Sequence, residues 1–294
     1  MAFRRTSNMR GSLRGVVIFA CILAVIVTAA LSFRFLHADT DADYLEIRFL
    51  DVGQADSALI QNKNGTVMID TGYRDSGAYL GNVLKECGNK ISCLILTHPH
   101  GDHIGGTLYV LEHCEVELVI LPTQPGEDAR YAAILEEIAE QNIPTRTLSP
   151  GEGFSLGRAR FTFLAPLRKY TDENDNSYVI RLDYREISAL FTGDAEAESE
   201  REQLKLYGSA EGGYLDADIL KVGHHGSASS TTDTYLAAVS PTYAVISCGM
   251  GNDYGHPHKE VTLRLNQAGI LTLRTDLAGN VHFRTDGETI ELLP

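Results

Sequence analysis

The chain lacks several features that would point to common kinds of chemistry. It has only five cysteines, and none of them stands in a metal-type spacing such as Cys-x-x-Cys. It has no Gly-x-Ser-x-Gly sequence, which argues against a serine nucleophile on a strand-to-helix elbow. No low-complexity stretch or internal linker divides the roughly 250 residues after the N-terminal region, and this length suits one sizeable α/β domain.

Basic residues are scarce outside the N-terminal region. Five of the 25 basic residues lie in the first 38 positions, which leaves 20 basic against 39 acidic residues and a net charge of −19 for the rest of the chain. Such a surface does not attract a polyanion over its whole area. The charge therefore argues against a high-affinity DNA-binding protein. It does not argue against a hydrolase that acts on one phosphodiester through metal ions and a few basic side chains.

The N-terminal region has the pattern of a membrane-targeting segment. Residues 1–14 carry four arginines and no acidic residue, which predicts a basic cytoplasmic N-terminus, and residues 15–33 are uncharged and strongly apolar. The apolar segment is either a signal peptide or an anchor. Its length and the lack of a clean cleavage site favour a single-pass anchor in the cell membrane, with residues 34–44 as a linker. The flanking charges place the remainder outside the cytoplasm, and it would be secreted if residues 15–33 were cleaved off.

A dense group of metal-type ligands follows the apolar run at residues 91–96. His98, His100, Asp102 and His103 fall within six residues. Imidazole and carboxylate are ligands that borderline divalent ions such as zinc or manganese accept. The spacing suits two ions better than one, because the first two histidines can point to one side of the turn while Asp102 and His103 open toward a second ion.

Further short motifs follow in order along the chain. They are Phe49–Ser57, Ile69–Gly72, Phe191–Asp194, Leu220–Ser227 and Tyr254–His258. With the histidine cluster, they resemble the extracytoplasmic metallohydrolase domain of the DNA-uptake channel family ComEC, within the metallo-β-lactamase superfamily. The resemblance spans roughly residues 45 to 292. It implies an α/β fold over residues 45–294, a four-layer αββα sandwich, placed after the N-terminal membrane segment.

The resemblance implies two divalent metal ions, zinc or manganese, as cofactors. The metal-binding residues that it assigns are His98, His100, Asp102, His103, Asp194, His224 and His225. In this assignment the first two histidines hold one ion and Asp102 and His103 hold the other. Asp194 bridges the two ions, and one of His224 and His225 completes the second site, although the spacing does not choose between them. Asp70 would orient a metal-binding histidine.

One departure from the superfamily pattern concerns the first ion. Members such as the β-lactamases and the RNase Z nucleases have an additional histidine between the first cluster and the bridging aspartate. Here the matching region, residues 172–177, contains none, and His113 comes too early. Asn176 or Ser177 would then serve as a weaker ligand or a substrate contact. The departure argues against a β-lactamase and leaves full occupancy of the first site open.

Several residues beside the cluster are candidates for catalysis or substrate binding. His256, at the rim of the site, could donate to a phosphate oxygen or protonate a leaving group, and His258 could contact substrate or simply belong to a helix-capping turn. Lys221 precedes the histidine pair and would contact substrate or support a ligand. The nucleophile would be a metal-activated hydroxide, oriented by Asp102 or Asp194.

Three functions from different classes fit these observations. The first is an extracytoplasmic metal-dependent phosphodiesterase or nuclease, whose substrate contains a phosphodiester, with DNA among the candidates. The second is a cell-surface esterase that acts on phosphocholine or other teichoic-acid substituents. The third is a non-catalytic, membrane-tethered module that retains the fold, and the complete ligand set argues against it. The membrane is the only other expected contact, because no pattern predicts a protein partner.

The expected elements alternate strands and helices in two runs. Strands are expected at residues 45–50, 57–61, 66–69, 91–96, 118–121, 219–222, 243–247 and 281–293, and between 160 and 192 around a polar break at 171–176. Helices are expected at residues 78–87, 103–113, 129–141, 195–206 and 260–268. Of the cysteines in this part, Cys87 and Cys93 are the nearest pair for a disulfide, and buried reduced thiols are equally compatible.

Overall fold

The computed structural model describes residues 43–294 except residue 128 and residues 209–212. Residues 44–294 form one compact unit. The predicted membrane segment at residues 15–33 lies outside the described part of the chain. Within that part, no helix has both the length and the apolar character needed to cross a bilayer.

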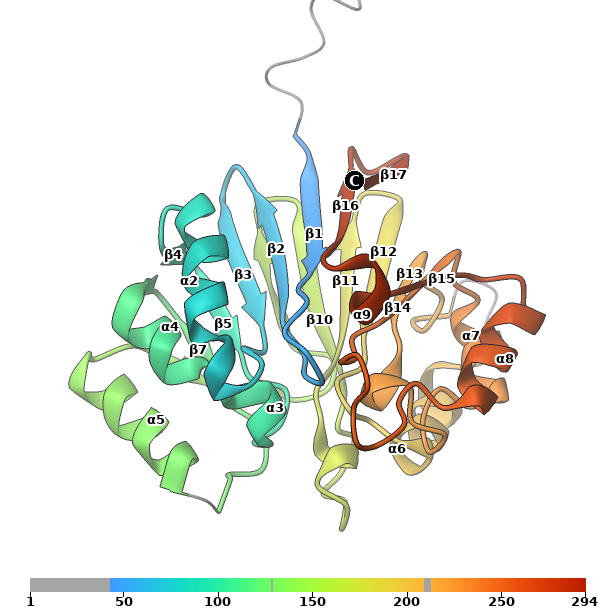
Figure 1. Cartoon of the computed structure of the whole chain (residues 1–294), viewed down its shortest axis with the longest axis horizontal. Coiled ribbons are helices and arrows are strands. Elements are labelled where there is room, and N and C mark those ends of the chain that lie inside the picture. Colours follow the sequence, from blue (N-terminus) through green and yellow to red (C-terminus); the bar gives the residue numbers. More distant parts are fainter. Residues whose placement is uncertain (1–42, 128, 209–212) are drawn as a thin grey trace, which may run out of the picture. The chain divides into compact units, whose positions relative to one another are not determined.

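Two large sheets form the centre of the domain (Figure 1). The first has eight strands in the order β17 (Ile290–Leu293), β16 (Val281–Thr285), β1 (Leu45–Phe49), β2 (Ala58–Asn62), β3 (Gly65–Ile69), β5 (Cys93–Ile95), β7 (Val119–Ile120) and β8 (Thr145–Arg146). The second has seven, in the order β15 (Leu271–Arg274), β14 (Tyr243–Ile246), β13 (Ile219–Lys221), β12 (Ile187–Phe191), β11 (Val179–Tyr184), β10 (Ala159–Ala165) and β9 (Gly153–Leu156). A small sheet pairs β4 (Lys90–Ile91) with β6 (Glu115–Val116).

Helices lie on both sides of this pair of sheets (Figure 1). Beside the first sheet are α2 (Gly77–Glu86), α3 (Gly101–Ile104), α4 (Thr107–His113) and α5 (Ala129–Glu140). The later helices are α6 (Ala197–Tyr207), α7 (Asp233–Val239), α8 (Lys259–Gln267) and α9 (Thr275–Ala278). Short 3-10 turns occur at η1 (Arg74–Ser76), η2 (Asn174–Asn176) and η3 (Gly223–Gly226).

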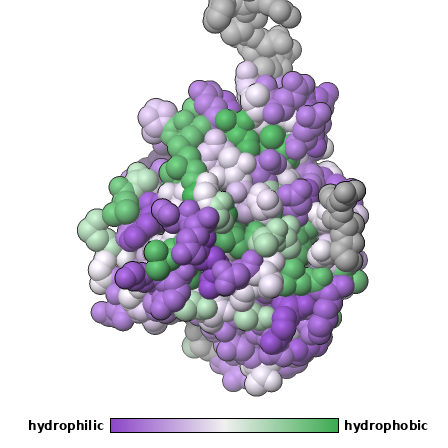
Figure 2. All heavy atoms as spheres, turned by 90° about the vertical axis from the view of Figure 1, so that its right-hand side faces the viewer, coloured by the Kyte–Doolittle hydropathy of each residue, from purple (hydrophilic) through white to green (hydrophobic). Residues whose placement is uncertain are grey.

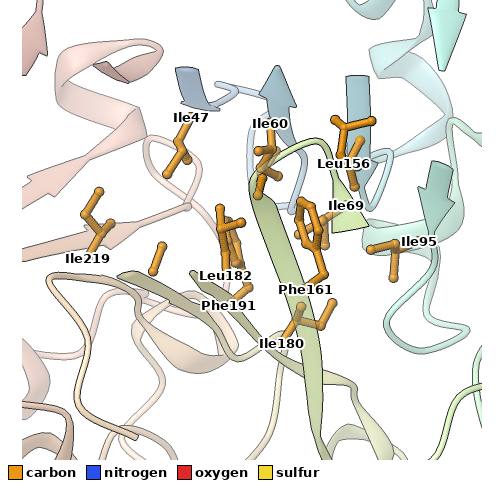
Figure 3. Close-up of a cluster of buried hydrophobic side chains, with 14 of the residues drawn as sticks. Ile47, Ile60, Ile69, Ile95, Leu156, Phe161, Ile180, Leu182, Phe191 and Ile219 are labelled. Carbon is orange, nitrogen blue, oxygen red and sulfur yellow. The ribbon is translucent and has the colours of Figure 1, made fainter. Parts of the chain in front are cut away.

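The main core fills the space between the two large sheets. Alternate residues of β1, such as Leu45, Ile47 and Phe49, point inward and are about 1 % exposed, as a half-buried strand requires. Figure 3 shows Ile47 and Ile60 of the first sheet facing side chains of the second. The Phe49 ring stacks on Phe191 with centroids 5.6 Å apart, so the two sheets are joined by direct aromatic contact.

Each large sheet also packs against its own helices through one further apolar cluster. Leu80 and Ile134 belong to the cluster under α2, α4 and α5, and Leu236 and Leu265 to the cluster under α7 and α8. The order of layers is therefore helices, sheet, sheet, helices, as the resemblance implied. In the view of Figure 2, hydrophilic side chains cover much of the surface and hydrophobic ones occur in smaller groups between them.

Most expected elements are present, with one instructive difference. The helix expected at residues 103–113 is split into α3 and α4 at Gly105 and Gly106. A Cβ on Gly106 would approach the carbonyl oxygen of Thr71 to 2.4 Å, and one on Gly105 would lie 2.6 Å from the backbone nitrogen of Arg74. Both glycines thus allow the chain after β3 to pack against the backbone here. The elements that were not expected from the sequence are helices α7 and α9 and strands β6, β8, β9 and β15.

The described cysteines carry no disulfide. Cys87, Cys93, Cys114 and Cys248 are all free thiols. Cys93 lies in β5, where burial raises the pKa of its thiol to about 12. A thiol in this environment is a poor nucleophile, so the structure assigns these residues to packing rather than to chemistry.

Candidate metal centre

The candidate site forms where strands from both sheets end. Asp70 follows β3, His98 follows β5, and Asp194 and His225 follow β12 and β13. Neighbouring strands in each of these pairs are parallel, so their carboxyl ends meet at one edge. Ligand and catalytic sites of open α/β sheets commonly occupy this edge. The residues predicted from distant motifs are thereby brought to one place.

Asp194 lies at the centre of the cluster and is buried. Its Oδ1 is 3.3 Å from Nε2 of His103, and its Oδ2 is 3.5 Å from Nε2 of His225. The same Oδ2 lies 3.7 Å from Nε2 of His224 and 4.0 Å from Nε2 of His98. One carboxylate therefore faces four imidazole nitrogens, which is the arrangement expected of a group shared by two cations.

Asp70 fixes the orientation of His103. Its Oδ2 accepts a hydrogen bond of 2.7 Å from Nδ1 of His103, and Thr97 donates to both of its carboxylate oxygens. The Thr97 hydroxyl proton is used on Asp70, so the Thr97 oxygen accepts from Nδ1 of His98 at 3.2 Å. With Nδ1 protonated in both rings, Nε2 of His98 and of His103 carries a free lone pair toward the cluster.

The two histidines of η3 are oriented by different acceptors. Nδ1 of His225 donates to the carbonyl of Ser247 at 2.9 Å, and Nδ1 of His224 pairs with Glu196 at 2.8 Å. Nε2 of each ring is thus left as a metal-type ligand atom. Both residues have positive φ, 46° and 52°, a conformation that non-glycine residues rarely adopt and that clusters at functional sites.

The two other predicted ligands, His100 and Asp102, are more exposed than the buried members of the cluster. Nε2 of His100 pairs with Glu173 at 2.8 Å, so Nδ1 is its remaining ligand atom, and its ring lies 4.5 Å from that of His98. Oδ2 of Asp102 is 3.4 Å from Nε2 of His225. The ligand atoms of Asp102, His103, Asp194 and His225 all lie within 4.8 Å of one another.

His256 and His258 show the opposite pattern of protonation. Oε1 of Gln54 accepts from the backbone nitrogen of Gly249, so its amide NH₂ group faces Nδ1 of His256 and donates to it over 3.1 Å. Nδ1 of His258 accepts from the backbone nitrogen of Ala228 at 2.9 Å. In both rings Nε2 must therefore carry the proton. These histidines present hydrogen-bond donors, not metal ligands.

The residues present fit a bound divalent cation. Nε2 of His98, His103 and His225 and Oδ1 of Asp194 are buried and have no hydrogen-bond partner in the described part of the chain. A buried polar atom left unpaired costs about 1–3 kcal/mol, so four of them in one place need a compensating partner. Imidazole nitrogens around carboxylates form the ligand set that zinc or manganese accepts.

The electrostatics of the cluster reflect this crowding of charge. The neighbouring carboxylates outweigh burial and raise the pKa of His225 to about 10, and they hold the pKa of His103 well above its ordinary value. Those imidazoles in turn lower the pKa of Asp194 far below the usual range of a carboxyl. Without a cation, protons occupy the positions that a metal would take.

Sequence and structure comparisons identify the family. The family model of the metallo-beta-lactamase superfamily matches residues 50–250. The chain belongs to this superfamily. It is 30 % identical over 261 residues to ComE operon protein 3 of Bacillus subtilis and 34 % identical over 237 residues to competence protein ComA of Neisseria gonorrhoeae. These matches confirm the ComEC-like resemblance.

The relatives are much longer than the region they share with this chain. The two alignments cover 81 % and 79 % of this chain but only 33 % and 31 % of the relatives, so the chain spans about a third of their length. Solved structures share the superfamily fold at low identity. CmlA, a diiron beta-hydroxylase from Streptomyces venezuelae, has a TM-score of 0.54 at 16 % identity over 85 % of this chain and 54 % of its own. The metallo-β-lactamase fold protein YhfI from Bacillus subtilis has a TM-score of 0.52 at 13 % identity over 78 % and 95 %.

Asn176 and Ser177, the residues expected in place of the superfamily's additional histidine, both contact the protein backbone. The amide of Asn176 bonds to the backbone of Tyr170 and Asp172, and so it holds the loop together instead of facing the cluster. The hydroxyl of Ser177 accepts from the backbone nitrogen of Asp194 at 3.2 Å. Both side chains thus contact the backbone beside the site, and the role of either as a weaker ligand or a substrate contact stays a prediction.

Lys221 lies in the core next to the site and contacts residues beside the ligands. It is only 3 % exposed, and its Nζ forms an ion pair with Asp56 and bonds to the carbonyl of Gly193 at 3.2 Å. The other carboxylate oxygen of Asp56 lies 3.4 Å from Nδ1 of His225. These contacts fit the second of the two predicted roles, support of a ligand, because the lysine is buried and its charge is paired with a carboxylate that also faces His225.

Sequence reasoning missed the partners of the ligands. Asp56, Glu196 and Gln54 contact His225, His224 and His256 respectively. Asp56 and Gln54 stand in the quoted motif Phe49–Ser57, and Glu196 follows Asp194 by two residues, so proximity to a motif was the available signal. His113 stacks on Tyr109 and His282 pairs with Glu46, so neither histidine belongs to the cluster. His37 lies outside the described residues.

Proposed function

We propose that this protein is an extracytoplasmic metal-dependent phosphodiesterase of the nuclease type. The observation that carries the proposal is the set of buried, unpaired nitrogen and oxygen atoms around Asp194, whose tautomers leave lone pairs directed at a shared centre. Membership of a superfamily of metal-dependent hydrolases and the competence proteins among the relatives support it. The extracytoplasmic location rests on the charge pattern around residues 15–33.

The proposal divides the ligands into two groups of three. His98, His100 and His224 would hold the first ion, and Asp102, His103 and His225 the second, with Asp194 bridging. Nε2 of both adjacent histidines lies near the same oxygen of Asp194, at 3.7 Å for His224 and 3.5 Å for His225, so this oxygen does not separate them. The assignment rests on Asp102, whose carboxylate lies 3.4 Å from Nε2 of His225. The ligand atom of His225 also groups with those of Asp102 and His103 within 4.8 Å. In this assignment His224, oriented by Glu196, takes the place of the missing superfamily histidine.

Divalent ions bound there would lower the pKa of a coordinated water to about 7 and withdraw charge from the phosphoryl oxygens. The protein's own groups supply orientation and proton handling. Asp102 is 23 % exposed, so its carboxylate can accept a hydrogen bond from the attacking water. His256 presents Nε2–H at the rim, next to the rings of His224 and His225 at 5.6 Å and 6.4 Å, and it can donate to a phosphoryl or leaving-group oxygen.

The test is an assay of the full-length chain purified in detergent and supplied with manganese or zinc. Bound metal would be quantified together with hydrolysis of bis(p-nitrophenyl) phosphate and of single-stranded DNA, beside the variant Asp102→Ala. We expect metal-dependent hydrolysis that the variant lacks. p-Nitrophenylphosphocholine is also a phosphodiester, so its hydrolysis without cleavage of bis(p-nitrophenyl) phosphate or of DNA would favour the wall-esterase alternative. Bound metal without turnover of any of these substrates would contradict the proposal and leave the non-catalytic alternative.

A further inference from the structure

A cavity of about 420 Å³ opens beside the histidine cluster and is not used by the site described above. Its polar and aromatic lining comes from Asp51, Tyr73, Arg74, Asp75, Tyr79 and Arg130. This volume falls within the range of about 300–1,000 Å³ that is typical of small-ligand pockets. The cavity is therefore large enough to hold a ligand group the size of a nucleoside.

The cavity borders the helix that carries Asp102 and His103. A Cβ on Gly105, at the end of this helix, would lie 2.6 Å from the backbone nitrogen of Arg74, so the two segments are in direct contact. The guanidinium of Arg130 lies over Gly101, the first residue of the same helix, so Arg130 also contacts this turn. A ligand in the cavity would thus lie next to the metal-binding turn.

The lining combines exposed aromatic and basic groups. The Tyr73 ring is 37 % exposed, and Tyr73 and Arg74 make no side-chain hydrogen bond or ion pair within the described ranges 43–127, 129–208 and 213–294. Tyr254, 64 % exposed, stacks on His256 with centroids 5.7 Å apart and offers a second ring at the rim of the site. Aromatic rings beside arginines are the combination with which proteins bind single-stranded nucleic acids.

The two acidic and two basic side chains of the cavity restrict which ligands it can bind. Asp51 and Asp75 balance Arg74 and Arg130, so the cavity does not attract a polyanion by net charge. A choline head group would find tyrosines and carboxylates there, but it would also meet two guanidinium groups of its own sign. A nucleoside with one attached phosphate suits the lining better, because its base can stack on Tyr73 while its phosphate pairs with an arginine.

We propose that this cavity binds one nucleoside unit of a single-stranded nucleic acid, next to the phosphodiester held at the metal cluster. The proposal rests on the proposed function and names its substrate class. The surface is acidic and few basic groups are available, so a broad positive surface does not recognise the strand. Recognition is local, through one stacked base and its phosphate.

The test measures binding of a fluorescein-labelled, phosphorothioate-linked (dT)12 strand to the full-length, manganese-loaded protein by fluorescence anisotropy. We expect Tyr73→Ala and Arg74→Ala each to raise the Kd about tenfold. Tyr73→Phe should restore near-normal binding, which excludes misfolding as the cause. The matched controls Tyr214→Ala and Arg201→Ala, at exposed positions on or near α6, should bind normally. Thymidine 5′-monophosphate should displace the strand and phosphocholine should not.

Absence of binding to (dT)12, normal binding by both cavity variants, or displacement by phosphocholine alone would each overturn the proposal. Turnover of bis(p-nitrophenyl) phosphate on the same wild-type preparation separates this failure from failure of the proposed function. Turnover without strand binding leaves the hydrolase and removes the nucleoside site. Strand binding that depends on Tyr73 without turnover supports the site and removes the phosphodiesterase.

Discussion

The Nζ atom of Lys221 is paired with the carboxylate of Asp56 in a buried ion pair directly beneath the candidate metal centre. Lys221 holds the pKa of Asp56 at about 2 in spite of complete burial. Asp56 in turn faces Nδ1 of His225 at 3.4 Å. The pair therefore links Lys221, in β13 of the second sheet, through Asp56 to the imidazole ring of the candidate ligand His225.

Removing the lysine should destabilise the protein strongly. In Lys221→Met the buried carboxylate of Asp56 would lose its partner, and such losses cost about 3–5 kcal/mol. The exposed pair of Lys205 with Glu202 provides the control, since Lys205→Met should cost less than about 1 kcal/mol. Urea unfolding of the metal-free proteins measures both values. Equal stability of Lys221→Met and the parent chain would show that the pair is not maintained in solution.

The two adjacent histidines should serve different ions. We expect His224→Ala and His225→Ala each to retain one of the two ions that the parent chain binds. We expect Glu196→Gln to weaken binding of the first ion about 10- to 100-fold, because His224 loses its orienting carboxylate. Glu198→Gln, two residues further along in the first turn of α6 and paired with Arg168 at the surface, is the matched control. Calorimetric titration with manganese gives both stoichiometry and affinity. Two ions bound normally by His224→Ala would contradict the assignment.

The sequence predicted the chemistry of the site better than its geometry. Motif order was enough to bring His98, Asp194 and the η3 histidines together, because each follows a strand of a parallel pair. It could not distinguish His224 from His225, since that choice depends on two consecutive residues with positive φ and on which acceptor each Nδ1 meets. It also left two roles open for Lys221, substrate contact or support of a ligand, because the sequence does not show that Asp56, distant along the chain, pairs with this lysine in the core.

Helices and strands with a strong hydrophobic pattern were predicted from the sequence, and those with a weak pattern were missed. Continuous apolar runs gave the central strands, and amphipathic segments gave α2, α5 and α8. The split between α3 and α4 could not be predicted, because it arises from backbone contacts of Gly105 and Gly106 with the chain after β3. Strand β15 has only four residues, none of them buried, at the edge of its sheet, so it lacks the apolar run that indicated the central strands.

The tautomer of His256 should matter for turnover but not for metal binding. Gln54→Leu removes the donor to Nδ1, so the ring can place its proton on either nitrogen, and we expect kcat to fall about 10-fold. His256→Ala removes the donor altogether and should lower kcat about 100-fold. Both variants should still bind two ions, and His113→Ala, at an exposed position on α4, should behave as the parent chain. Loss of an ion from His256→Ala would instead make this residue a ligand.

Glu200 should make stability depend on pH. It is 2 % exposed and accepts from the backbone and hydroxyl of Thr232 at 3.0 Å and 2.7 Å, and burial raises its pKa from 4.5 to about 7. Between these values the folded chain keeps a proton that the unfolded chain has released. Stability therefore falls as the pH rises through this window, by up to about 1.4 kcal/mol per pH unit.

The variant Glu200→Gln isolates this effect, because glutamine resembles the protonated form and does not titrate. From pH 5 to pH 8, we expect the parent chain to lose about 2–3 kcal/mol more unfolding free energy than the variant. Urea unfolding with chelator present measures both proteins, and the comparison cancels the titration of the histidine cluster, which the two share. Glu198→Gln, exposed on the same helix, should follow the parent curve. Parallel curves for the parent chain and Glu200→Gln would show that Glu200 is ionised in the folded state throughout, with its charge stabilised by the hydrogen bonds at the start of α7.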